Sequence, residues 1–171
     1  WVRIDKDYTF DGPNGRETLA QLFGDRSQLV VYHLMFAPEW EVACKSCSFW
    51  ADNYDRIGVH LAQRDVSLVA VSRAPLERLE ATKRRFGWSF EWVSSGAGDF
   101  GRDFGVHFTA ADLASGEKRY NYGTLRFGLA DAPGISVFCA SAEYVERAEA
   151  RPPPQPASNT LMEASSLPFK S

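Results

Sequence analysis

Two short runs of apolar and β-branched residues constrain the fold of this chain most strongly. The first covers residues 28–36 (QLVVYHLMF), and the second covers residues 65–72 (DVSLVAVS). Continuous runs of this kind are typical of strands that are covered on both faces of a sheet. The segment between them has the length of a helix, so the pair predicts a parallel β–α–β unit with a right-handed crossover. We therefore expect an α/β protein.

A helix is expected between these two strands, over residues 46–63. Its spacing predicts a buried stripe formed by Phe49, Ile57 and Leu61. Gly58 weakens this helix because glycine has a low helix propensity. The prediction gives the unit one long crossover helix.

Further elements are indicated on both sides of the unit. A helix is expected to begin at Pro75, which suits a first helical turn, and to end at Gly87. A DGPNG turn after Phe10 predicts an edge hairpin. Other short elements are expected at residues 90–94 (strand), 99–104 (helix or turn) and 134–139 (strand). Residues 109–129 have no clear period and are expected to be mostly loop.

The chain has 171 residues and a formal net charge of −3. This length is typical of one domain with a sizeable core. The charge offers no basic face, so nucleic acid and anionic membranes are poor partners. The longest apolar run, residues 29–37, is interrupted by His33 and is too short to span a bilayer. We therefore expect a soluble domain that acts on neither.

The composition changes abruptly near the C-terminal end. RPPPQP at residues 151–156 cannot continue a helix or a central strand. The predicted organisation is one domain over residues 1–147, followed by a disordered Pro- and Ser-rich tail over residues 148–171.

The chemistry of the chain is indicated by Cys44 and Cys47, a CxxC pair directly after the first buried strand. A helix that begins there stabilises a thiolate through its unpaired N–H groups and its macrodipole. Cys47, one turn further on, can attack a mixed disulfide on Cys44. Such a pair favours a reducing compartment, and we expect a cytoplasmic protein that needs no cofactor.

A zinc site is the alternative interpretation of the CxxC pair. Structural zinc needs four ligands. The available additional ligands are Cys139, His33, His60 and His107, and none of them forms a second paired spacing. We therefore expect no metal, with His33 buried in the core and the other two histidines at the surface or in packing contacts.

Ser72 and Arg73 follow the second strand at its carboxyl end. In an open parallel sheet these ends converge on one crevice, which would bring Arg73 towards the thiolate or an anionic substrate. A surface loop arginine is the alternative.

Three more side chains flank the dithiol. Trp40 and Trp50 can form the walls of an apolar groove, or they can simply pack in the core. Asp52 can accept a proton near Cys47, or it can be a solvated carboxylate on a helix face.

Several segments together match one known pattern. They are WVR with DKDY in residues 1–8, QLVVYHLMFAP at 28–38, CKSCSFWAD at 44–52, SRAPL at 72–76 and GW at 87–88. Over residues 1–138 the chain resembles the bacterial thioredoxin-like family catalogued as domain of unknown function 899. The resemblance implies a central mixed sheet flanked by helices, with Cys44 and Cys47 as the CxxC of the family. Its flanking residues match at Phe49, Trp50 and Asp52.

The chain departs from related patterns at two places. A peroxiredoxin-like peroxidase would have Thr three residues before its nucleophile, where this chain has Glu41. The family continues after the last predicted strand with a His-Thr-Tyr segment, a further strand and a closing helix, whereas here Cys139 and the Pro-rich tail follow. We therefore expect this C-terminal strand and helix to be missing or replaced, as a truncation or reading-frame change would cause.

Three functions remain open from the sequence. The first is a thiol–disulfide oxidoreductase that acts on a thiol or disulfide substrate, either a protein or a small molecule. The second is a thiol peroxidase, in which Cys44 becomes a sulfenic acid and Cys47 condenses with it. The third is a thioredoxin-fold binding protein without catalytic activity.

Overall fold

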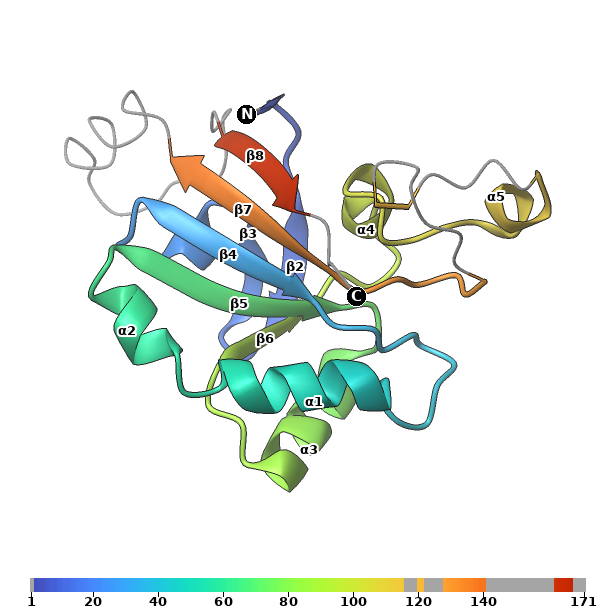
Figure 1. Cartoon of the computed structure of the whole chain (residues 1–171), viewed down its shortest axis with the longest axis horizontal. Helices are drawn as coiled ribbons and strands as arrows, with labels where there is room; N and C mark the ends of the chain where they lie inside the picture. The colour runs from blue at the N-terminus through green and yellow to red at the C-terminus, as the bar shows by residue number, and fades with distance from the viewer. Residues whose placement is uncertain (1, 116–119, 122–127, 141–161, 168–171) are drawn as a thin grey trace.

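The two apolar runs form neighbouring parallel strands at the centre of one sheet. In the computed structural model, β4 (Gln28–His33) pairs with β5 (Val66–Ser72), and Val31 lies opposite Val69. The structure describes residues 2–115, 120–121, 128–140 and 162–167. The predicted β–α–β unit is confirmed, because α1 and α2 connect the two strands (Figure 1).

The sheet contains eight strands among the described residues, in the order β1-β8-β7-β4-β5-β6-β2-β3. The remaining strands are β1 (Val2–Ile4), β2 (Thr9–Gly12), β3 (Gly15–Thr18), β6 (Glu91–Ser94), β7 (Gly134–Ala140) and β8 (Met162–Leu167). β4, β5 and β6 run parallel, while β7 is antiparallel to β4 and β2 is antiparallel to β6. The sheet is therefore mixed, and the β2–β3 hairpin forms one edge as expected.

The described residues form six helical segments around this sheet. They are η1 (Gln21–Phe23), α1 (Lys45–Tyr54), α2 (Gly58–Ala62), α3 (Leu76–Phe86), α4 (Phe100–Asp103) and α5 (Ala110–Ser115). Figure 1 shows α1, α2 and α3 grouped together, apart from α4 and α5.

Two separate hydrophobic cores form on the two faces. The alternation of β4 sends Leu29 and Val31 into one core with Phe100, and Tyr32 into the other with Cys47 and Leu79. The dithiol thus belongs to the α1–α3 face.

The predicted helix over residues 46–63 is wrong in two respects. It is divided into two helices, α1 and α2. At the break between them, the Asp55 carboxylate accepts hydrogen bonds from the backbone N–H groups of Ser89 and Phe90. The predicted buried stripe is also wrong, because Phe49 is 63% exposed and Ile57 is 37% exposed. The buried side of α1 is formed instead by Cys47, Ser48 and Ala51. Small side chains let α1 lie close to the sheet, which a search for large apolar residues does not detect.

Two segments expected to lack regular structure contain short elements. In residues 109–129, α5 begins where Thr109 and Asp112 exchange hydrogen bonds, with the Asp112 carboxylate accepting from the Thr109 N–H at 2.7 Å. In the tail, β8 pairs with β7 and β1. β8 therefore adds a strand to the sheet between β7 and β1. The rest of the tail, residues 148–161 and 168–171, lies outside the described residues.

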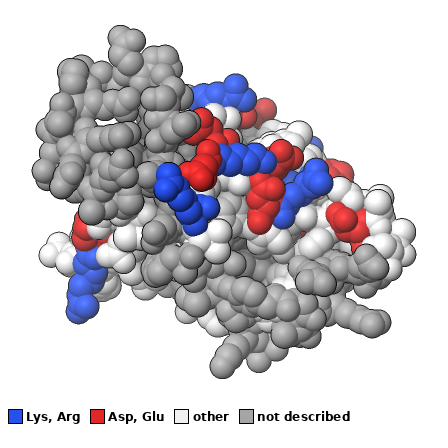
Figure 2. All heavy atoms as spheres, turned by 90° about the horizontal axis from the view of Figure 1, so that it is seen from above, with Lys and Arg blue, Asp and Glu red and all other residues white. Residues whose placement is uncertain are grey.

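Acidic and basic side chains lie side by side on the face shown in Figure 2. Lys6, for example, donates to Asp99 at 3.0 Å and to Asp103 at 2.6 Å, which attaches the chain before β2 to α4. Within the part of the chain that the structure describes, no helix combines the length and the apolar character that a bilayer span requires.

Candidate functional site

Cys44 is the N-cap of α1, which follows β4 after the loop of residues 34–43. Its backbone N–H donates to the carbonyl oxygen of Met35 at 3.0 Å, and its own carbonyl accepts from the Ser48 N–H at 2.9 Å. The first bond attaches the start of the helix to the segment directly after the central strand, and the second is the first hydrogen bond of the helix itself. The predicted position of the dithiol, at a strand-to-helix junction, matches this geometry.

The two cysteines differ in exposure. Cys44 is half-buried, whereas Cys47 is 2% exposed, and both are free thiols. No side chain caps α1, and its first turn contains no acidic residue. The unpaired N–H groups and the positive end of the helix dipole are therefore directed at the position of Cys44, and no carboxylate of this first turn opposes them.

Burial raises the pKa of the Cys47 thiol to about 12. The Cys44 thiol, which lies within hydrogen-bonding reach, adds to this increase, while the Met35 backbone and the Tyr32 hydroxyl act in the opposite direction. Cys47 is therefore a neutral thiol at pH 7, and its sulfur needs local help to become a thiolate.

Tyr32 lies beneath α1 and was not among the residues that the sequence singled out. Its hydroxyl donates to the Cys47 carbonyl oxygen at 3.1 Å, and the edge of its ring meets Tyr54 at a centroid distance of 5.0 Å. Burial raises the pKa of this phenol far above its ordinary value, so Tyr32 stays protonated. Strand alternation is the signal that indicates its position, since it places Tyr32 on the opposite face from His33.

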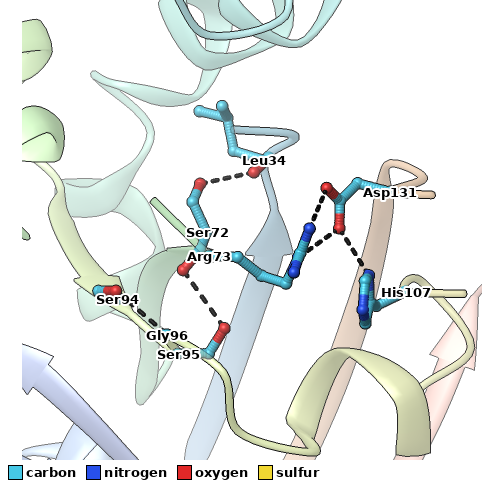
Figure 3. A network of polar contacts seen from close by, with 8 residues as sticks. All are labelled: Leu34, Ser72, Arg73, Ser94, Ser95, Gly96, His107 and Asp131. Carbon is cyan, nitrogen blue, oxygen red and sulfur yellow. Dashed lines mark hydrogen bonds and ion pairs between the residues drawn. The ribbon is translucent and has the colours of Figure 1, made fainter. Parts of the chain in front are cut away.

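Ser72 and Arg73 have separate structural roles at the end of β5. The Ser72 hydroxyl donates to the Leu34 carbonyl at 2.5 Å and accepts from the Trp92 indole at 2.9 Å. Arg73 forms two hydrogen bonds with the Asp131 carboxylate, at 2.8 and 3.0 Å. Figure 3 shows Arg73 and His107 converging on Asp131, and His107 Nδ1 lies 3.0 Å from that carboxylate. Arg73 is thus engaged in an ion pair rather than exposed on a surface loop.

A small pocket lies beside this ion pair, at the carboxyl ends of β4 and β5. Arg73, His107 and Asp131 line it together with His33 and Phe100. Its volume of about 30 Å³ is enough for one or two water molecules. His33 is a core histidine, as predicted, and its Nε2 lies 2.8 Å from the Ser136 hydroxyl. Burial lowers the pKa of His33 to about 3.

The other candidate side chains lie around α1. Trp50 is 41% exposed and stacks on Tyr54, whereas Trp40 packs against the core on the α1–α3 face. Neither tryptophan lines the pocket beside Arg73 or the small aromatic pocket beside Tyr54. The Asp52 carboxylate accepts a hydrogen bond from the Trp88 indole at 2.6 Å, which attaches α1 to the segment before β6.

Within the described residues, no group of three or more His, Cys, Asp and Glu side chains is arranged to hold a metal ion. The Asp131 carboxylate that joins Arg73 to His107 was not foreseen. It lies 58 residues after Arg73 and 24 after His107, and no local pattern marks such a pairing.

Comparisons with known proteins agree with this fold. The family described as "Bacterial protein of unknown function (DUF899)" matches residues 1–148. Peroxidoxin BcpB from Mycobacterium tuberculosis has a similar structure, with a TM-score of 0.55 and 14% identity over 80% of this chain and 75% of that one. Peroxiredoxin Q from Xanthomonas campestris gives a TM-score of 0.51 and 16% identity, over 92% of this chain and 78% of the other. A search of curated proteins gives no match.

These likenesses establish the fold alone, because the identities are low. The fold is thioredoxin-like, as the sequence predicted, with a central mixed sheet flanked by helices. The dithiol lies at the end of the central strand of that sheet, where α1 begins.

Proposed function

This chain belongs to the DUF899 family of bacterial proteins, and we propose that it is a thiol–disulfide oxidoreductase whose Cys44–Cys47 dithiol exchanges with a disulfide substrate. The observation that carries the proposal is the asymmetry of the pair at the start of α1. The outer sulfur is half-buried at the helix N-terminus, and the inner sulfur is buried one turn further on. An accessible nucleophile and a protected resolving thiol are what such an exchange requires.

The reaction proceeds in two balanced steps. The Cys44 thiolate attacks one sulfur of the substrate disulfide, forms a mixed disulfide and releases the other sulfur as a thiolate, which takes a proton from solvent. Cys47 then loses its proton and attacks the Cys44 sulfur, which releases the second substrate sulfur as a thiol. The substrate gains two electrons, and the protein is left with a Cys44–Cys47 disulfide.

The raised pKa of Cys47 supports this order of events. A neutral inner thiol does not compete with Cys44 for the substrate at pH 7. It becomes a nucleophile only when it meets the mixed disulfide beside it, so the protein forms the intermediate before it resolves it.

Thiol-linked reduction of insulin or of a chromogenic disulfide tests the proposal. We expect Cys44→Ser to abolish exchange, because it removes the attacking sulfur. Cys47→Ser should accumulate a mixed disulfide of one substrate per chain, detected by mass. Cys139→Ser is the matched control, since Cys139 lies on β7 and not in α1, and it should retain full activity.

Exchange that survives Cys44→Ser would contradict the proposal, as would the absence of exchange in the unmodified chain. Consumption of peroxide in the presence of a thiol donor, without disulfide exchange, would instead assign the same two sulfurs to a peroxidase.

A further inference from the structure

Packing against the sheet and against Tyr54 holds the Tyr32 hydroxyl next to Cys47, the inner cysteine. Tyr32 is 2% exposed on β4, and Ala70 is its partner on β5. The edge contact with Tyr54 fixes the ring from the side, at an interplanar angle of 80°. The hydroxyl therefore stays next to Cys47, to whose carbonyl it donates at 3.1 Å.

Few groups near Cys47 can favour its charged form. Burial and the Cys44 thiol raise the pKa of Cys47, while the Met35 backbone and the Tyr32 hydroxyl lower it. Tyr32 thus supplies the side-chain donor at this sulfur.

We propose that Tyr32 donates a hydrogen bond to the Cys47 thiolate, both when Cys47 attacks the mixed disulfide and when it leaves as the Cys44–Cys47 bond is reduced. This inference rests on the proposed dithiol function. The hydroxyl has a single proton, which it gives to the Cys47 carbonyl while Cys47 is a thiol. A thiolate is the stronger acceptor because it is charged, so the O–H group rotates towards the sulfur once the charge forms.

Tyr32 acts as a donor and not as a base. Its own pKa is raised by burial and by the two cysteines, so the phenol keeps its proton throughout the cycle. The proton lost from Cys47 passes to solvent, and the electrons move only between sulfur atoms. The hydroxyl therefore changes the rate of the second step, but it neither gains nor loses a proton or an electron in that step.

The rate of the second step tests this assignment. In a Cys139→Ser background, 5,5′-dithiobis(2-nitrobenzoate) forms a mixed disulfide at Cys44, and attack by Cys47 releases a second thionitrobenzoate. Loss of one hydrogen bond should raise the pKa of Cys47 by about one unit and leave about tenfold less thiolate. The thiolate that remains is about threefold more nucleophilic, because its pKa is higher. Tyr32→Phe should therefore slow the release of the second thionitrobenzoate about threefold, and by the same factor at every pH from about 6 to 9.

Tyr54→Phe is the matched control. Tyr54 packs on Tyr32, and burial is the cause of its own raised pKa. We expect this variant to release the second thionitrobenzoate at the original rate. Equal slowing by both substitutions would show a packing effect and overturn the assignment, and so would an unchanged rate in Tyr32→Phe.

A second measurement separates this inference from the proposed function. In a Cys44→Ser, Cys139→Ser chain, Cys47 is the remaining thiol, and its alkylation by iodoacetamide reports its thiolate without any exchange. Tyr32→Phe should slow this alkylation about threefold as well. If no second thionitrobenzoate is released by any variant, the dithiol function fails, and the alkylation rate alone decides the role of Tyr32. An equal or faster alkylation overturns it.

Discussion

His33 shows how one residue can make the stability of this fold depend on pH. It lies 4% exposed at the end of β4, with its ring stacked on Phe100 at 5.5 Å and its Nε2 beside the Ser136 hydroxyl. Burial lowers its pKa from 6.5 to about 3, because an imidazolium there would lose its water. The folded chain therefore keeps His33 neutral, whereas the unfolded chain protonates it below pH 6.5.

The consequence is a loss of stability on mild acidification. The pKa of the folded state is the lower one, so this contribution is complete above pH 6.5 and decreases as the pH falls towards 3. The free energy of unfolding should fall by about 2 kcal/mol between pH 7.5 and pH 5 through this residue. Urea unfolding at several pH values measures the effect, and His33→Gln should remove this part of the slope. A slope that is the same in both chains would exclude His33 as its source.

Some site residues can be predicted from the sequence and others cannot, for physical reasons. Cys44 and Cys47 could be predicted because their chemistry depends on their spacing along one helix turn. Asp131 could not be predicted, because its ion pair with Arg73 joins segments that only the folded chain brings together. Tyr32 lies between these cases, since alternation predicts its face but not its contact with Cys47.

At the scale of elements, the helix ends were predictable because they depend on single residues. α3 begins after Pro75 and ends at Gly87, which has a φ of +73°. Glycine adopts this left-handed conformation without the steric cost that a Cβ introduces. The buried face of α1 was not predictable in this way, because it depends on how closely the helix approaches the sheet.

Two glycines with opposite roles allow a matched test at this scale. A Cβ at either Gly87 or Gly58 meets no atom within 4 Å, so differences in backbone conformation decide the outcome. Gly87→Ala should lower the free energy of unfolding by about 1 kcal/mol, because alanine disfavours a positive φ. Gly58→Ala, at the start of α2, should raise it by up to about 1 kcal/mol through helix propensity. Urea unfolding followed by tryptophan fluorescence measures both, and changes of the same sign would contradict this account.

At the scale of the whole molecule, the sheet depends on pairing between distant segments. β4, β5 and β6 follow one another along the chain, so local patterns predict their arrangement. β8 comes from a segment that has no strand pattern, yet it lies between β7 and β1. Pairing of this kind is non-local, and propensity along the sequence contains little information about it.

The position of β8 predicts how the sheet changes when this strand is removed. β1 pairs with β8, and β7 has β8 on one side and β4 on the other. Removal of residues 162–171 should therefore leave β1 without its described partner strand and turn β7 into an exposed edge. Amide hydrogen exchange should accelerate in β1 and in alternate residues of β7, while β4 and β5 stay protected. Removal of residues 168–171 alone keeps β8 and serves as the control. Unchanged exchange in β1 after the longer deletion would mean that β8 does not hold that edge in solution.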